Sequence, residues 1–371
     1  MASTVADVGS SRSLVSQLRS ARRPPPRTWA IAAGSLVFLA AQAHGATTCP
    51  RTAPAGVPGV VALSIENDKV VGTDRNFTSG VRLSWLSAAN DVPDWACRAA
   101  EAIPFLLDPG GLFHIGFAAG HNIYTPADTS RSDLIVGDRP YAAWLYAGLM
   151  FVSDTGPTRD RTATATLETL EIDIGVVGPS AQGEWVQNEL HRLLGVDPAN
   201  GWDNQLEDEP GIMIAYERKW RNWRPLSESR FGTLGIDAIP HVSASLGNVY
   251  TYAGIGGVVR LGQGLEVDYG PPRIRPALPG SAYFRNPERF SWYVFAGAEG
   301  RLVARDIFLD GNTFRDSHSV DKEPLVGEFQ FGLAILLGGV RLSYTHVIRS
   351  REFEGQDEGH QFGALGMSVR F

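Results

Sequence analysis

The chain has few cysteines and, beyond its first 45 residues, no long hydrophobic run. Two cysteines in 371 residues, Cys49 and Cys97, exclude a small domain held together by many disulfides. A membrane-spanning helix needs about 20 mostly apolar residues, and no later segment resembles one. A lipobox is also missing before Cys49, which argues against a lipoprotein. The mature chain is therefore neither a disulfide-rich mini-domain nor a bundle of membrane helices.

The first 45 residues have the order of a secretory signal peptide. Five arginines precede an apolar run from Trp29 to Ala41, and small residues follow up to Gly45. The alternative is a membrane anchor, but the apolar run is shorter than a bilayer requires. We predict a signal peptide over residues 1–45 and one barrel domain over residues 46–371.

The predicted mature chain is acidic. The whole chain has a formal charge of -7, and removal of a segment with five Arg and one Asp leaves -11. Exported proteins with an excess of negative charge are poor candidates for binding nucleic acid. We predict no nucleic-acid partner.

From about residue 60 onward, apolar and polar residues alternate with the period of a β-strand. Val61, Leu63 and Ile65 alternate with small or polar residues in this way. Clusters of Gly, Pro, Asn or Asp bound each segment. The twelve predicted strands cover residues 61–66, 77–85, 112–122, 141–152, 164–177, 210–219, 234–247, 250–262, 291–304, 325–337, 339–349 and 361–371.

The last predicted strand indicates what surrounds the sheet. Leu365, Met367, Val369 and Phe371 alternate with small or polar residues, and Phe371 is the final residue. Strands of about ten residues with one apolar face are typical of outer-membrane barrels. A soluble β-sandwich explains the alternation, but neither the signal peptide nor the terminal Phe. We predict an all-β, twelve-stranded antiparallel transmembrane β-barrel in a Gram-negative outer membrane, with Phe371 read by the assembly machinery.

Connection lengths predict how the barrel is oriented. If both termini are periplasmic, Gly338–Gly339 forms a tight periplasmic turn. Cys49 and Cys97 then share the periplasmic side, where one disulfide is expected, the alternative being two unrelated thiols. The long, charged connections face outward, near residues 67–76, 121–140, 178–209, 305–324 and 350–360.

One outward connection is predicted to contain a short amphipathic helix. Pro179–Ser180 supplies its start, Gly195 its end, and Val186, Leu190 and Leu193 an apolar stripe.

Gln187 and His191 lie one turn apart on this helix. A neutral imidazole can take a proton from water, and an amide can position that water or a substrate. The alternative is a solvated histidine with no catalytic role.

Polar residues also end the first two predicted strands. Asn67 and Asp68 supply an amide and a carboxylate, which suit either the orientation of a histidine or a cation site. An Asx-turn is the alternative for this pair. Thr78 lies at the matching end of the second strand, so we predict that Asn67 and Thr78 are neighbours. Ser79 is a conceivable nucleophile, but nothing near it in the sequence indicates activation.

An acidic run follows the helix. Its carboxylates repel one another unless a cation or basic groups offset them, and calcium prefers such oxygen ligands. EF-hand spacing is missing, so a solvated loop is an equal alternative. The run comprises Asp197, Asp203, Glu207, Asp208 and Glu209, and a smaller oxygen-rich cluster comprises Asp306, Asp310 and Asn312.

Several short motifs, in this order, resemble the lipid A deacylase (LpxR-like) family of outer-membrane barrels. They are IEND, FTSG, GDRP, DIGVVGPSAQG, VQNELHRLLG and GWDNQLEDEP, and the likeness spans nearly all of the mature chain. The resemblance implies a calcium-dependent esterase between the outer wall and a loop helix. Such an enzyme removes the acyloxyacyl chain at the 3' position of lipid A, the lipid of lipopolysaccharide.

The resemblance also implies roles for individual residues. His191 resembles the general base and Gln187 the glutamine one turn before it. Asn67 and Asp68 match the paired residues that end the first strand, and Thr78 matches the threonine of the second.

Two further family positions are changed in this chain. Asp197 stands where some members have glutamate, and with Asp68 it is a candidate calcium ligand. Arg131 is nearest to a lysine of some members, and with Arg75 and Arg139 it could bind the phosphates of lipid A. In the implied mechanism, calcium stabilises the oxyanion that forms when hydroxide attacks the ester.

Two other classes of protein compete with this interpretation. His241 and Ser243 have the spacing of an outer-membrane phospholipase, but the adjacent Pro240 predicts a strand start near the periplasm and a structural role. A porin or adhesion barrel would account for the strands and leave the histidine helix without a purpose.

Overall fold

The computed structural model describes residues 57–68, 76–103, 107, 111–156, 164–229, 232–270, 283–285 and 290–371. The predicted signal peptide, Cys49 and Arg75 lie outside these residues. The signal peptide and the pairing of Cys49 with Cys97 therefore stay predictions.

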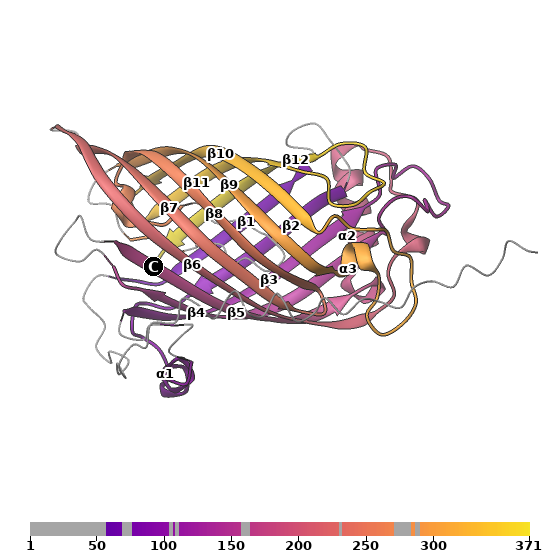
Figure 1. Cartoon of the computed structure of the whole chain (residues 1–371), viewed down its shortest axis with the longest axis horizontal. Coiled ribbons are helices and arrows are strands. Elements are labelled where there is room, and N and C mark those ends of the chain that lie inside the picture. The colour runs from indigo at the N-terminus through magenta and orange to yellow at the C-terminus, as the bar shows by residue number, and fades with distance from the viewer. Residues whose placement is uncertain are drawn as a thin grey trace, which may run out of the picture. The chain divides into compact units, whose positions relative to one another are not determined.

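Twelve antiparallel strands form one closed barrel, as the alternation predicts (Figure 1). Each strand pairs with its sequence neighbours, and β1 closes the barrel by pairing with β12, from Val60 opposite Arg370 to Asn67 opposite Gly363. The strands are β1 Val60–Asn67, β2 Asn76–Leu86, β3 Leu112–Thr125, β4 Ala142–Asp154, β5 Ala165–Val177, β6 Glu209–Ser229, β7 Gly232–Gly247, β8 Tyr250–Gln263, β9 Ser291–Asp306, β10 Leu325–Leu337, β11 Val340–Arg349 and β12 His360–Arg370.

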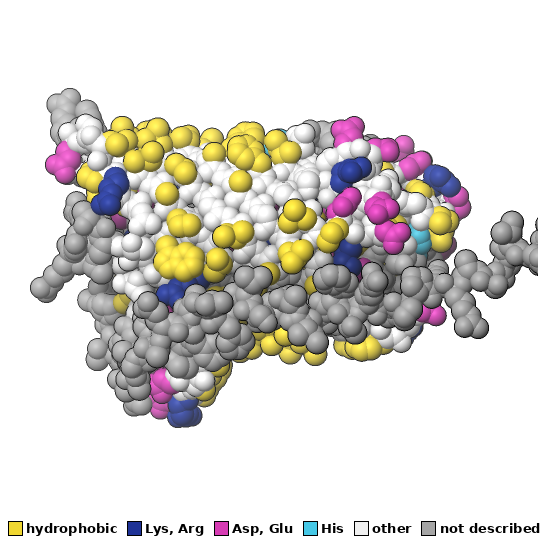
Figure 2. All heavy atoms as spheres, viewed as in Figure 1, with side chains coloured by type: hydrophobic (Ala, Val, Ile, Leu, Met, Phe, Trp, Pro, Cys, Tyr) yellow, Lys and Arg dark blue, Asp and Glu magenta, His cyan; other side chains and the backbone are white. Residues whose placement is uncertain are grey.

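The faces of the strands are those of a membrane barrel. Along β10, Phe329, Phe331 and Leu333 are 41–46% exposed, whereas Glu328 and Gln330 are buried inside. Figure 2 shows hydrophobic side chains over the middle of the barrel wall and charged side chains towards its ends. Apolar side chains facing out and polar ones facing in are what a barrel surrounded by lipid requires.

The predicted strand limits agree with the observed ones within a few residues, except in β6. That strand continues to Ser229, ten residues beyond the predicted end. The extension contains Pro225, where the pairing with β7 shifts in register before Ser227. Proline is tolerated at such a bulge, but in a sequence it indicates the end of a strand.

The helices divide between the two ends of the barrel. Among the described residues, no helix is long and apolar enough to cross a membrane. We call the end with the odd-to-even connections the α2 end and the other the α1 end (Figure 1). The predicted helix set omits α1, which contains Cys97. The helices are α1 Asp94–Glu101, η3 Pro179–Ala181, α2 Gly183–Leu194, η4 Trp202–Asn204, η5 Leu265–Val267 and α3 Ile307–Asp310.

The connection between β10 and β11 is the tight turn expected from its glycines. Leu337 pairs with Val340, so the turn consists of Gly338 and Gly339 alone. Their φ angles are 58° and 89°, a left-handed conformation that glycine adopts without strain.

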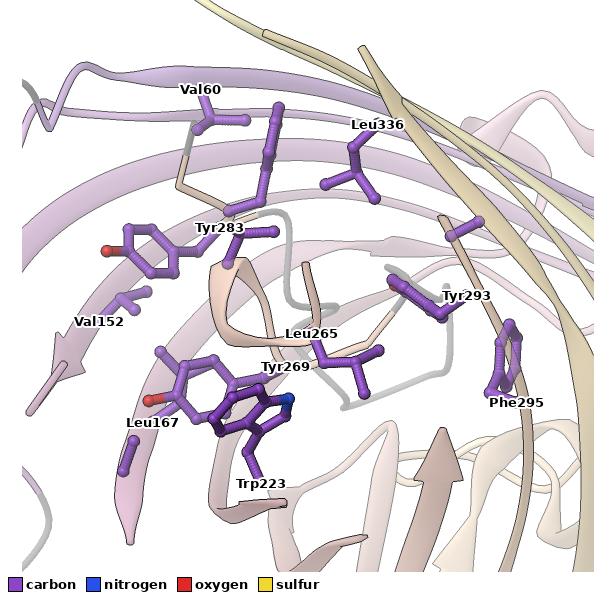
Figure 3. Packing of buried hydrophobic residues seen from close by; sticks show 14 of the residues in the cluster. Val60, Val152, Leu167, Trp223, Leu265, Tyr269, Tyr283, Tyr293, Phe295 and Leu336 are labelled. Carbon is purple, nitrogen blue, oxygen red and sulfur yellow. The ribbon is translucent and has the colours of Figure 1, made fainter. Parts of the chain in front are cut away.

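The connection between β8 and β9, at the α1 end, folds into the barrel instead. Its Leu265, Tyr269 and Phe284 are buried in a cluster with residues of β1, β2, β4, β5, β6, β9 and β10. Only a segment inside the barrel can contact strands all around it. Figure 3 shows Leu265 and Tyr269 near Trp223 of β6. We call the described residues 265–270 and 283–285 the plug.

A buried charge network holds the plug. Asp268, fully buried, accepts hydrogen bonds from Arg341 at 3.0 Å and from Tyr293 at 2.8 Å, and also pairs with Arg260. The alternation of the strands did not predict this network, because Asp268 at its centre lies in the plug, outside any strand.

Candidate active site

Helix α2 begins later than its sequence predicts. Pro179–Ala181 forms a separate 3-10 turn, and α2 starts at Gly183 after Gln182, whose φ is 60°. Ser180 does not cap α2, because its backbone N–H and hydroxyl both donate to the Asp208 carboxylate, each at 2.7 Å. The end of the helix at Gly195 is confirmed, with a left-handed φ of 70°.

Helix α2 turns a polar face towards the barrel. Leu193 of its apolar stripe is 72% exposed, whereas Gly183, Gln187 and His191 are buried. The reason is the close approach at Gly183, where an added Cβ would lie 2.5 Å from both Ala143 and Trp202. The helix therefore turns its smallest residue and its two polar residues towards the barrel.

The helix region packs on the outside of the barrel wall. Ile123 of β3 and Ala143 of β4 share a buried cluster with Ala181 and Trp202. Ile123 lies on the same face of β3 as the lipid-facing Phe117, by strand alternation. His121 donates its Nε2 hydrogen to the carbonyl oxygen of Ala181 at 2.8 Å, which fixes η3 to the same wall.

His191 is held in one tautomer. Its side chain is 2% exposed, and Nδ1 lies 2.6 Å from the carbonyl oxygen of Asp197. A carbonyl oxygen only accepts hydrogen bonds, so Nδ1 carries the hydrogen and, in the neutral ring, Nε2 carries the lone pair. Asp197 contributes its main chain here, and its own side chain is exposed.

Trp202, which the sequence analysis did not identify as a site residue, fixes the side chain of Gln187. Its Oε1 accepts a hydrogen bond from Trp202 Nε1 at 2.8 Å. Its Nε2 is buried and has no hydrogen-bond partner among the described residues. Buried donors are normally paired, so this nitrogen is suited to a substrate or a water molecule.

Asn67 and Thr78 are neighbours, as predicted. Asn67 Nδ2 donates to the carbonyl oxygen of Thr78 at 2.9 Å, and the hydroxyls of Thr78 and Thr125 lie 2.7 Å apart. A register shift between Phe77 and Ser79 places Thr78 at a β-bulge, a feature that redirects a side chain. Asp68, just after β1, is fully buried.

Strand register links the end of the first hairpin to the helix. Asn67 is directly opposite Ser79, Ser79 opposite Ile123, and Ile123 opposite Ala143. Adjacent strands are about 4.8 Å apart, so Asn67 lies about 10 Å from Ile123, on which the helix region packs. The predicted residues of the hairpin and of α2 thus occupy one stretch of the wall at the α2 end.

The acidic run and the smaller oxygen-rich cluster are distributed among separate bonds. Glu209 accepts from Asn312 Nδ2 at 3.1 Å and Thr313 N at 2.8 Å, and Asp203 is exposed. Asp306 caps α3 at Phe308 N, Asp310 pairs with Lys322 at 2.7 Å, and Glu207 lies 3.7 Å from Arg315. In the described part of the chain, no group of three or more His, Cys, Asp or Glu could hold a metal ion.

Arg139 is not placed to bind a phosphate. It is 1% exposed and donates to Glu352 at 2.9 Å, with its guanidinium near the rings of Tyr124 and Phe353. Arg131 is exposed and pairs with Asp133.

His241 and Ser243 lie inside the barrel. Pro240 is in the middle of β7, so its interpretation as a strand start was wrong. His241 Nε2 is 3.1 Å from Glu299 Oε2, and both His241 and Ser243 are 5% exposed. A serine in the interior is separated from lipid by the barrel wall, and this argues against the phospholipase interpretation.

A family model described as "Outer membrane protein LpxR" matches residues 30–371. The chain belongs to the LpxR family. Its membership and its closed barrel establish an outer-membrane protein, as its strands predict. A comparison with curated proteins finds no match.

One solved structure supports the fold of this chain. LpxR from Salmonella typhimurium is 23% identical, with 84% of this chain and 100% of that chain covered and a TM-score of 0.65. The β domain of the Bordetella autotransporter BrkA is 11% identical. The match covers 85% of this chain and 100% of that chain, with a TM-score of 0.37. The first likeness supports the barrel fold, and the second is too distant to support an argument.

Proposed function

We propose that this protein is a lipid A 3-O-deacylase whose active site lies between α2 and the barrel wall. Membership of the LpxR family supports the activity class. The single observation that carries the site is the buried His191 on α2, because a fixed Nδ1–H leaves Nε2 as the basic nitrogen. The α2 end would face the outside of the cell, where lipid A forms the outer leaflet.

In the proposed reaction, His191 Nε2 takes a proton from water, and the resulting hydroxide adds to the ester carbonyl carbon. The bond between that carbon and the sugar oxygen then breaks, the imidazolium gives its proton to the sugar oxygen, and the acyl chain leaves as a carboxylic acid. The Asp197 carbonyl keeps the ring oriented and stabilises the imidazolium that forms. Gln187 Nε2 donates to the attacking water or to the ester, and Trp202 holds the amide in place. Siting the reaction on the lipid-facing wall lets the substrate stay in the membrane.

The first hairpin would supply the remaining polar groups. Asn67 is oriented by its bond to Thr78, and the adjacent Asp68 offers a buried carboxylate. The exposed Leu190 and Leu193 give α2 an apolar surface suited to an acyl chain. Val186, the third residue of the apolar stripe, packs against the wall instead.

Calcium remains part of the proposal. Asp68 and Asn67 supply the oxygen ligands that calcium prefers, so the residue types fit. Since the described residues contain no larger carboxylate cluster, carbonyl oxygens and water would complete its six to eight ligands. When bound, calcium supplies positive charge for the oxyanion. Asp197 is the second candidate ligand, although its exposed side chain gives it less support.

The direct test of the function is the mass of lipid A. Expression of the full chain in a bacterium with hexa-acylated lipid A should convert most of it to a species lacking the 3'-acyloxyacyl group. Mass spectrometry measures this loss, and a vector without the gene is the control. Unchanged lipid A, with the barrel folded in the outer membrane, would refute the proposal.

Metal removal should abolish the reaction. Purified protein in detergent micelles, treated with a chelator and then desalted, is expected to lose more than about 90% of its deacylation of lipid A, because the oxyanion then lacks a cation. Added calcium should restore it. Full activity after chelation would remove the metal from the mechanism and leave the histidine proposal intact.

A further inference from the structure

A second pocket lies at the α2 end, between two connections that the proposed reaction does not use. It has a volume of about 270 Å³ and is formed by the β3–β4 and β11–β12 connections. None of its lining residues belongs to α2 or to the first hairpin. The lining includes the polar residues Asp138, Gln356, Asp357 and Glu358.

The two connections are held firmly against each other. An added Cβ on Gly355 would lie 2.0 Å from the carbonyl oxygen of Gly137, so the backbones are in contact. The Arg139–Glu352 ion pair joins the same two connections at 2.9 Å. Burial alone would raise the pKa of Glu352, but Arg349 and Arg139 outweigh it and lower the pKa to about 2. The ion pair therefore persists at neutral pH, and the pocket is preformed.

Gln356 lines this pocket and has a side-chain donor without a partner among the described residues. Its side chain is 6% exposed, and its Oε1 accepts a hydrogen bond from the backbone N–H of Glu352 at 2.8 Å. That bond identifies the other atom as the amide nitrogen. Nε2 is buried without a hydrogen-bond partner among the described residues. A ligand oxygen would satisfy it.

The charge of the lining decides the class of ligand. Three carboxylates line the pocket, from Asp138, Asp357 and Glu358, and no Lys or Arg does. A phosphate or other anion would be repelled. These three carboxylates do not converge on one point, because no group of three His, Cys, Asp or Glu among the described residues could hold a metal ion.

A sugar ring matches the carboxylates, the amide donor and the apolar surface of this pocket. Its hydroxyls can donate to the carboxylates, and one of its oxygens can accept from Gln356 Nε2. Backbone N–H groups of Ala127 and Arg139, each at 2.7 Å, orient the Asp138 carboxylate. Ile135 and Phe353 provide apolar surface for the C–H face of a ring. The volume is below that of a drug-sized site and suits one ring.

We propose that this pocket binds one uncharged pyranose unit. Resting on the proposed function, its source would be the glycan that lipopolysaccharide carries beyond lipid A, and a free monosaccharide is the other source. The β3–β4 connection also bonds to the segment after α2, where Asn200 N donates to Thr129 O at 2.9 Å and Asn204 Nδ2 to Ser132 O at 2.9 Å. One connection thus joins the pocket to the candidate active site.

Binding is tested with the full chain in detergent micelles, by saturation-transfer NMR with D-glucose, D-galactose and D-glucose 6-phosphate. We expect transfer to at least one neutral sugar, and at least tenfold weaker binding of glucose 6-phosphate than of glucose. Gln356→Glu keeps the acceptor for Glu352 N but removes the donor. Gly137→Leu fills the pocket, and a Cβ there meets nothing within 4 Å. Each variant should weaken binding at least tenfold.

Gly327→Leu is the matched control, because an added Cβ at this strand position also meets nothing within 4 Å. It should bind sugar like the wild type. Absence of neutral-sugar binding by the wild type, or binding that both pocket variants retain, would overturn the proposal. Heat-dependent migration on gels verifies that each variant forms a barrel.

Kinetics then distinguish the two sources. If the substrate's glycan occupies the pocket, both pocket variants should raise KM at least fivefold for lipopolysaccharide with a complete core and leave KM for sugar-free lipid A unchanged. Equal KM values with intact sugar binding would assign the pocket to free sugars and overturn the glycan source. Failure of the wild type to deacylate either lipid would refute the proposed function, whereas the NMR result would still judge the pocket.

Discussion

Alanine in place of His191 is expected to lower the rate of lipid A deacylation roughly 10²- to 10⁴-fold, which is the usual contribution of a general base. The variant loses the Nε2 lone pair, and the neighbouring His121 already uses its Nε2 to bind the Ala181 carbonyl oxygen. The rate is measured as release of the 3'-acyloxyacyl group by mass spectrometry, with purified protein and lipid A. The fold should survive, since Gly183 of α2, Ala181 of η3 and Trp202 of η4 pack this region on the wall.

Ser243→Ala is the control for this experiment. Ser243 has the other nucleophile-like spacing in the chain, but it lies inside the barrel. Its loss should leave the rate within about twofold of the wild type. A reversed outcome, with His191→Ala active and Ser243→Ala inactive, would exclude the α2 site and favour the phospholipase interpretation.

The second large effect is expected from the plug. Asp268→Asn keeps the shape of the side chain but removes the negative charge that faces Arg260 and Arg341. Removing one partner of a buried ion pair typically costs about 3–5 kcal/mol. We expect the free energy of unfolding to fall by that amount, measured by urea titration in micelles with tryptophan fluorescence.

Asp203→Asn provides the comparison, because Asp203 is an exposed aspartate at the α2 end. Surface substitutions of this kind usually change stability by less than about 0.5 kcal/mol. Equal unfolding midpoints for the two variants would mean that the Asp268 network does not hold the plug.

Strand positions could be predicted from the sequence because each face of a membrane strand meets a different solvent. Leu365, Met367 and Val369 face lipid, so apolar residues must occur at every second position along β12. Pro225 shows the limit of this pattern, since its bulge keeps a strand going where composition indicates an end. The plug was not predicted because a loop inside a barrel shows no regular alternation of apolar and polar residues.

The candidate site was predictable in its residue types and less so in its geometry. Pairing of Asn67 with Thr78 follows from two strand ends that meet across a hairpin. The inward face of α2 does not follow from its apolar stripe, because the close contact at Gly183 sets the rotation of the helix. Trp202 and the Asp197 carbonyl were also missed, since a main-chain acceptor and an indole donor leave no distinctive spacing in a sequence.

The seam between β1 and β12 has a consequence for biogenesis. Val60 and Arg370 are paired although 310 positions separate them in the chain. Forming this contact therefore has the largest entropic cost of loop closure in the sheet. Until it forms, β1 and β12 each expose a row of unpaired backbone groups, which lipid cannot satisfy. Closure of the seam must therefore come late, and a ribosome that stops before β12 would yield a product that cannot remain in the membrane.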